Sequence, residues 1–153
     1  MIAKKHLVAV AVGACLLGLP GLSSQKNPVE RPNKGVVHLT AVVDLADGSF
    51  VATSVGHATH GGRTTHIATG FMDVLTGAIL SVSGVITASN GDEIWFESLP
   101  VGTPVFTGGT GRFEEATGTQ TVVEIWDVEI TKDPVTNTRT MRYSARVEGT
   151  ITY

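Results

Sequence analysis

The sequence predicts an all-β protein, an eight-stranded antiparallel up-and-down β-barrel. Two observations support this fold class. From residue 35 to the end of the chain, valine, isoleucine and threonine dominate, and no ten-residue stretch has the apolar stripe of an amphipathic helix. Turn signals rich in glycine, asparagine and aspartate divide this region into eight short segments. Short strands joined in series are typical of a barrel or a sandwich, and we predict the barrel.

The first 23 residues have the layout of a secretory signal peptide. Lys4 and Lys5 precede an uncharged apolar run, residues 7–19, that is too short to cross a bilayer. Pro20 and Gly21 break this run, and the small residues Gly21 and Ser23 suit cleavage after Ser23. We therefore expect a secreted or periplasmic protein with no transmembrane segment in the mature chain.

Cys15 offers an alternative, because residues 12–15 (VGAC) resemble a lipobox in which this cysteine is lipidated. Against that alternative, the apolar run continues beyond Cys15 to Leu19, where a lipoprotein would turn polar. Cys15 is also the only cysteine of the chain. After cleavage at Ser23 no cysteine remains, so disulfide bonds do not stabilise the domain.

Residues 24–34 are polar, contain Pro28 and Pro32, and predict a disordered leader before a barrel domain at 35–153. Loss of Lys4 and Lys5 with the signal leaves nine basic against 14 acidic residues. The mature chain has no basic cluster that could neutralise phosphates, so we exclude nucleic acid as a partner. Nothing in the sequence indicates a cofactor.

The eight strands are expected at residues 36–45, 50–59, 63–72, 79–88, 93–99, 103–107, 119–131 and 139–152. The last hairpin indicates its own register, because a four-residue loop, 134–137, pairs Asp133 with Thr138. This register places seven residues on one apolar face, which we expect to be core: Trp126, Val128, Ile130, Met141, Tyr143, Ala145 and Val147. Three of them, Trp126, Tyr143 and Met141, are the candidate ligand-binding residues.

A second turn, Asn90-Gly91, is typical of a two-residue hairpin loop and would pair Ile86 with Trp95. Both faces of this hairpin are partly apolar, so the pattern leaves its lumenal face open. The acidic residues on either side of Trp95 favour Ile94 and Phe96 as the inward pair.

The most distinctive stretch is Gly108-Gly109-Thr110-Gly111-Arg112-Phe113, followed by Ala116-Thr117-Gly118. It resembles the glycine element of dirigent proteins and of allene oxide cyclase-like barrels, including small secreted bacterial relatives. The resemblance implies an eight-stranded antiparallel barrel with an apolar lumen, often dimeric or trimeric, in a family that binds, orients or cyclises small hydrophobic compounds. No motif here matches the catalytic residues of the plant enzymes. We interpret the glycines as a sharp barrel corner, with Phe113 filling the barrel end.

Two histidines form a weak candidate metal site. If Asp47-Gly48 is a two-residue turn, His38 lies directly across from His57. A third ligand is missing, and two surface histidines are the simpler interpretation. The His57/His60 spacing suits a helix, and on a strand these residues point to opposite faces.

Glu124 is the weak catalytic candidate. The predicted register places its carboxylate opposite Val147 on the apolar face, where burial would raise its pKa toward that of a general acid. The alternatives place it in water at the barrel rim, or turned outward by a bulge. The mature chain has no cysteine and no nucleophile elbow, so we propose no covalent catalysis.

Three functions follow from this reading. The first is a binding module whose lumen accommodates a small apolar molecule. The second is an isomerase or cyclase of the allene oxide cyclase type, assisted by Glu124. The third is a structural protein whose lumen is filled by its own side chains. An empty apolar cavity would separate the first two from the third, and a polar group inside that cavity would favour the enzyme.

Overall fold

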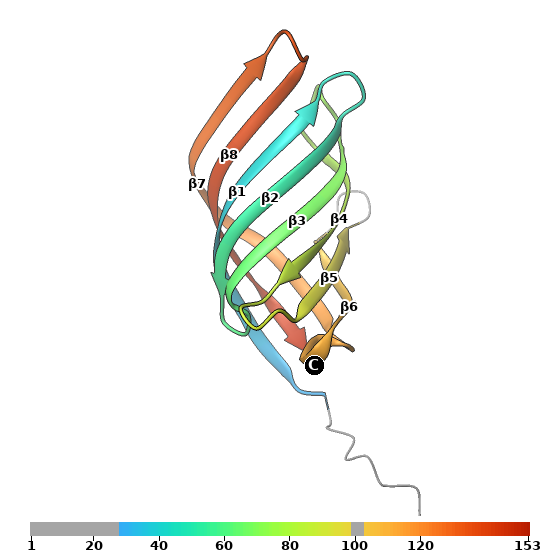
Figure 1. The fold of residues 1–153 in the computed structure, drawn as a ribbon, viewed down its shortest axis with the longest axis vertical. Helices are drawn as coiled ribbons and strands as arrows, with labels where there is room; N and C mark the ends of the chain where they lie inside the picture. Colours follow the sequence, from blue (N-terminus) through green and yellow to red (C-terminus); the bar gives the residue numbers. More distant parts are fainter. Residues whose placement is uncertain (1–27, 99–102) are drawn as a thin grey trace, which may run out of the picture.

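A computed structural model describes residues 28–98 and 103–153 of the chain. The predicted signal peptide and Cys15 lie outside the described residues. The predicted fold is confirmed: eight antiparallel strands form one closed up-and-down barrel, in which each strand pairs with its sequence neighbours and β8 pairs with β1 (Figure 1). The strands are β1 (Glu30–Asp44), β2 (Ser49–Ala58), β3 (Gly62–Met72), β4 (Ile79–Thr87), β5 (Glu93–Ser98), β6 (Val105–Gly109), β7 (Thr117–Asp133) and β8 (Thr138–Thr152). Among the described residues no helix is long and apolar enough to cross a membrane.

Strand β1 begins at Glu30, so the expected leader is too long at its C-terminal end. Residues 30–34 pair with β8, from Glu30 opposite Thr152 to Lys34 opposite Glu148. Pro32 tolerates this position because β1 pairs with β2 only from Gly35 onward. A proline without an N–H is accepted where one side of the strand has no partner.

The β1–β2 turn corrects the expected pairing of His38 with His57. The loop has four residues, 45–48, because the Asp44 carboxylate accepts a hydrogen bond from Ala46 N and the Asp47 carboxylate accepts one from Ser49 N, both at 2.8 Å. The register is therefore shifted by two residues, and His57 lies opposite Val36. A shift of two keeps every side chain on its expected face.

The β4–β5 turn is also longer than expected. Ala88 N donates to Asp92 O at 2.8 Å and Gly91 N donates to Ala88 O at 3.0 Å, which makes a three-residue loop with Gly91 at φ 88°. Ile86 consequently pairs with Ile94 and not with Trp95. Ile94 is buried and Trp95 is 42% exposed, so Ile94 is on the inward face, as expected.

Strand β7 contains two bulges that the sequence pattern did not reveal. The register shifts between Trp126 and Glu129, where Asp127 has φ 54°, and again between Val122 and Glu124. Near the turn the predicted pairs hold, including Ile130 with Met141. Val128 and Ile130 are each 59% exposed, however, so the expectation that they belong to the core is wrong. Beyond the first bulge the strand is turned over, so the expected face is wrong there: Trp126 pairs with Ser144 instead of Ala145, and Glu124 with Arg146 instead of Val147.

One end of the barrel is filled by a hydrophobic cluster. The 3₁₀ helix η1 (Gly111–Phe113) follows β6 and inserts Phe113, which is fully buried. Tyr153, directly after β8, packs edge-on against Phe113 with ring centroids 4.9 Å apart. This plug, as we name the cluster, contains Ile86, Ala88, Ile94, Phe106, Phe113, Ala116 and Ile151.

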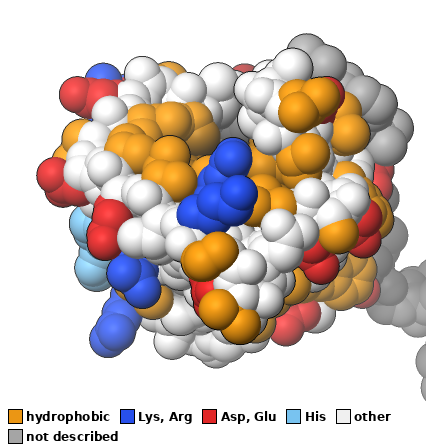
Figure 2. Space-filling model, turned by 90° about the horizontal axis from the view of Figure 1, so that it is seen from above, with side chains coloured by type: hydrophobic (Ala, Val, Ile, Leu, Met, Phe, Trp, Pro, Cys, Tyr) orange, Lys and Arg blue, Asp and Glu red, His pale blue; other side chains and the backbone are white. Residues whose placement is uncertain are grey.

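The opposite end is more open. Among the described residues, β6 pairs with β7 through Val105 with Thr119 and Phe106 with Gly118, so most of β7 has no partner strand on that side. The β7–β8 ribbon, in contrast, stays paired to Asp133 and Thr138 and extends past the other strands (Figure 1). Seen from this end, hydrophobic side chains gather around a group of Lys and Arg side chains near the centre (Figure 2).

Candidate functional site

The candidate site is a cavity of about 220 Å³ inside the barrel, which we call the lumen cavity. It is mostly apolar and is bordered by strands on all sides of the barrel. The side chains that line it are Val37, Leu39, Ala41, Phe50, Ala52, Ser54, His66, Ala68, Met72, Ile79, Val82, Phe96, Pro104, Gln120, Val122, Met141, Tyr143, Ala145 and Val147.

Small residues in one row across the sheet leave room for this cavity. Ala52 pairs with Ala68, Ala68 with Gly84, and Gly84 with Phe96. The Phe96 ring lies over Gly84, where an added Cβ would come within 2.7 Å of the ring. Narrow eight-stranded barrels are normally filled by their own side chains. Ala52 and Ala68 line the cavity and leave space that larger residues would occupy, whereas the space over Gly84 is taken by the Phe96 ring.

His66 is the most distinctive polar group in the lumen cavity. Its neighbours across the sheet are Ser54 on β2 and Ile86 on β4. One ring nitrogen, Nε2, lies 3.0 Å from Oγ1 of Thr64, a side chain that is itself 1% exposed. Burial lowers the pKa of His66 to about 4, because the charged ring would lose its water shell. The ring is therefore neutral at neutral pH.

The other polar side chains of the cavity are also neutral. Burial raises the pKa of Tyr143, which keeps its hydroxyl protonated. Ser54 and Gln120 complete the polar set, and no Asp, Glu, Lys or Arg is among the described residues that line the cavity. The site therefore offers hydrogen bonds without any charge.

Two of the three predicted ligand-binding residues lie in this cavity. Met141 and Tyr143 are on its wall, whereas Trp126 is not. Trp126 pairs with Ser144, which alternates with the lumenal residues Tyr143 and Ala145, so both Trp126 and Ser144 belong to the outer face. The bulge between Trp126 and Glu129 is the physical reason for this reversal.

Glu124 lies on the outer face as well. Its Oε2 atom is 3.2 Å from Nη1 of Arg146, and both side chains are about half exposed, at 55% and 51%. The expected position opposite Val147 is wrong, because the bulge between Trp126 and Glu129 brings Glu124 opposite Arg146 instead. The alternative in which a bulge turns Glu124 outward is the one that the structure contains.

The two candidate metal ligands are separated in register. His38 lies opposite Val55, and its Nδ1 forms a 2.8 Å hydrogen bond with Oγ of Ser144. His57 is exposed opposite Val36. Within residues 28–98 and 103–153, no group of three or more His, Cys, Asp or Glu side chains is placed to hold a metal ion.

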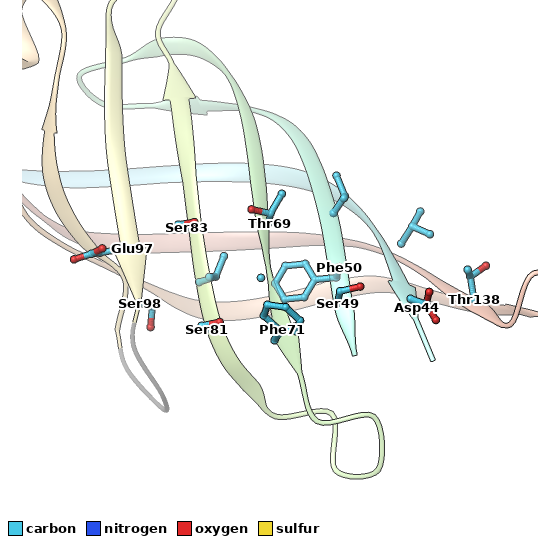
Figure 3. Close-up of a pocket in the computed structure, with 14 residues that line it drawn as sticks. Asp44, Ser49, Phe50, Thr69, Phe71, Ser81, Ser83, Glu97, Ser98 and Thr138 are labelled. Atoms are coloured by element: carbon cyan, nitrogen blue, oxygen red, sulfur yellow. The ribbon is translucent and has the colours of Figure 1, made fainter. Parts of the chain in front are cut away.

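A second pocket, about 640 Å³, is a shallow groove on the outer face of β1 to β5. Its polar groups do not converge: Asp44 and Thr138 lie at one end, Glu97 and Ser98 at the other, and the rings of Phe50 and Phe71 lie between them (Figure 3). The Asp44 carboxylate already caps the β1–β2 turn. Although larger, the groove encloses a ligand poorly, and the lumen cavity is the stronger candidate.

No protein-family model, curated protein or solved structure matches this chain.

His66 lines the candidate site and was not predicted from the sequence. Its signal was weak: on β3 it alternates with Thr64 and Ala68, and a row of threonine, histidine and alanine does not look like a core. Only the pairing of β3 with β2 and β4 shows that these residues share the lumen with Ala52 and Ser54. The register was needed to find the site.

Proposed function

We propose that this protein binds a small, mainly apolar molecule in the lumen cavity. The observation that supports this function is the cavity itself, about 220 Å³ with an apolar wall and four neutral polar groups. Concave, mostly apolar sites with a few placed polar groups are typical of small-molecule binding. A barrel serving only as a structural element would gain stability by filling this space, since each unfilled volume loses packing contacts.

Binding is better supported than catalysis. The cyclase alternative relied on Glu124, and that carboxylate is paired with Arg146 on the outer surface. A polar group in the cavity was the feature expected to favour an enzyme, and His66 is such a group. With a pKa of about 4, however, His66 is a weak base at neutral pH, better suited to accept or donate a hydrogen bond than to remove a proton from carbon.

Two further points belong to this proposal. The resemblance of residues 108–118 to dirigent and allene oxide cyclase-like barrels agrees with a ligand-binding lumen, and we propose that relationship together with the family's tendency to form homo-oligomers. The signal-peptide layout of residues 1–23 leads us to propose that the barrel acts after export, as a secreted or periplasmic protein.

Native mass spectrometry of the protein purified from its own source tests the proposal directly. A co-purifying small molecule, lost on mild activation, is the expected result. The matched test is Ala68→Phe, which places a ring in the lumen cavity, against Thr69→Phe, which places the same ring on the exposed outer face of the same strand. Ala68→Phe should abolish binding, and Thr69→Phe should retain it.

Two results would contradict the proposal. One is a protein that carries no small molecule and binds no apolar probe in titration. The other is equal binding by Ala68→Phe and Thr69→Phe, which would place the ligand outside the barrel.

A further inference from the structure

We propose that the lumen cavity selects an uncharged, mainly apolar molecule of about ten non-hydrogen atoms whose hydroxyl group is held by His66. This inference rests on the proposed ligand-binding function and adds the chemical class of the ligand. It follows from the volume of the cavity, the absence of charge on its wall and the free nitrogen of His66.

The cavity volume limits the size of the ligand. A dry apolar cavity of ~150 Å³ is large enough to hold benzene, which has six carbon atoms. The lumen cavity, at about 220 Å³, is about half as large again. A compact molecule of about ten non-hydrogen atoms, such as a fused two-ring compound, therefore fits without displacing the wall.

The wall discriminates against charged ligands. Every polar side chain of the described lining is neutral, and a carboxylate or ammonium group transferred there would lose its water without gaining an opposite charge. His66 does not supply that charge, because burial keeps its ring neutral. The site therefore favours ligands that form hydrogen bonds and disfavours ligands that carry a charge.

His66 has one nitrogen available to a ligand. Thr64 is the partner of Nε2, and no partner of Nδ1 is found among the described residues. No fully buried side-chain polar atom of those residues lacks a hydrogen-bond partner, so Nδ1 retains some accessible surface. Because His66 lines the lumen cavity, we assign this nitrogen to a ligand in the cavity. A hydroxyl both donates and accepts, so it pairs with Nδ1 in either tautomer of the ring.

Two cations near the open end do not change this preference. Lys132 and Arg139 pair with each other across the β7–β8 ribbon, two residues beyond Ile130 and Met141. That is about 7 Å further along the strand, and neither residue belongs to the described cavity lining. An ion pair formed in water contributes ~0–1 kcal/mol, less than the cost of burying the partner charge.

The test compares three probes with one skeleton: naphthalene, naphthol and naphthoate, titrated at pH 7 into the protein expressed from the full chain. We expect naphthol to bind about tenfold more tightly than naphthalene, the gain expected of one well-formed buried hydrogen bond. Naphthoate should bind more weakly than both. In His66→Leu, the advantage of naphthol over naphthalene should fall below about twofold, while naphthalene still binds.

Matched variants separate His66 from its surroundings. His57→Leu makes the same chemical change on the exposed outer face and should leave all three affinities unchanged. Tyr143→Phe removes the phenolic hydroxyl of the wall and should keep the preference for naphthol. If His66→Leu does not fold, His66→Gln retains a hydrogen-bonding group of similar size and should keep a reduced preference.

The outcomes distinguish this inference from the function on which it rests. If none of the probes binds, the proposed function fails. If all three bind but naphthoate equals naphthol, or if His66→Leu keeps the naphthol preference, the function stands and the ligand class is wrong. Loss of the preference in Tyr143→Phe alone would move the hydroxyl site from His66 to Tyr143.

Discussion

Glu124 and Arg146 face each other across the β7–β8 ladder on the outer surface of the barrel, with Oε2 and Nη1 3.2 Å apart. The register predicted from the sequence placed this carboxylate on the apolar face, next to Trp126, with a position at the rim or an outward turn at a bulge as the alternatives. Its actual position makes it a surface ion pair between half-exposed side chains, which decides what its removal would do.

We predict that Glu124→Gln changes the free energy of unfolding by less than about 1 kcal/mol, since exposed ion pairs contribute ~0.2–1 kcal/mol. Urea unfolding at low and high salt measures this, and the difference should shrink at high salt. Probe binding should not change. A large loss of binding in this variant would show that Glu124 acts in the site after all.

Stability should depend on pH through His66. Its folded-state pKa of about 4 lies below the ordinary value of 6.5, so the unfolded chain takes up this proton first as the pH falls. The free energy of unfolding is therefore not reduced by His66 above about pH 6.5, and it declines as the pH falls toward 4. Below about pH 4 the loss levels off at about 3 kcal/mol. Urea unfolding at a series of pH values measures the slope.

His66→Leu should remove that slope between pH 6.5 and 4, whereas His57→Leu should keep it. Hydrogen bonds from backbone N–H groups lower the pKa of the turn residues Asp47, Asp73 and Asp133, whose effects therefore appear only below about pH 4. An unchanged slope in His66→Leu would mean that the ring is not buried in the folded protein.

The plug should contribute a large part of the free energy of unfolding, because its side chains are buried. Phe113→Ala should cost about 3–5 kcal/mol, because Phe113 is fully buried and contacts Tyr153. Phe71→Ala is the matched control, since Phe71 is half exposed on the outer face, and it should cost less than half as much. Thermal or urea unfolding compares the two variants, and equal losses would contradict a buried plug.

The exported protein should begin near Ser24. N-terminal sequencing or intact-mass measurement of protein from the source cells checks this, and Leu16→Arg, which interrupts the apolar run, should leave the precursor uncleaved in the cell. Two findings would disagree: an intact Met1 in the exported protein, or a lipid on Cys15.

The fold was predictable because its signals are local. Each turn is marked by glycine, asparagine or aspartate, and each strand by β-branched residues, so seven strands were found within about two residues of both ends, whereas β1 begins at Glu30 and not at residue 36. The two-residue slip at Asp44 to Ser49 was harmless, because strand faces alternate with period two.

The site was less predictable because it depends on which face of the strand each side chain occupies. It also depends on neighbouring strands that are distant in the sequence. A single extra residue at Asp127 and Val128 moved Trp126 and Glu124 to the outer face, and nothing in those residue types marks a bulge. The cavity, in turn, is created by small residues on three strands, and their coincidence appears only when the ladders are aligned.

The pairing of β1 with β8 along the full length of both strands, from Glu30–Thr152 to Asp44–Thr138, has a kinetic consequence. Within the barrel, β1 is synthesised first and β8 last, so the contacts between β1 and β8 have nearly the greatest sequence separation possible in this domain. Such non-local pairing slows folding, because the loop-closure entropy is lost before the ladder forms. The barrel therefore cannot close until β8 has been synthesised, and a covalent link between the start of β1 and the end of β8 should make it fold faster.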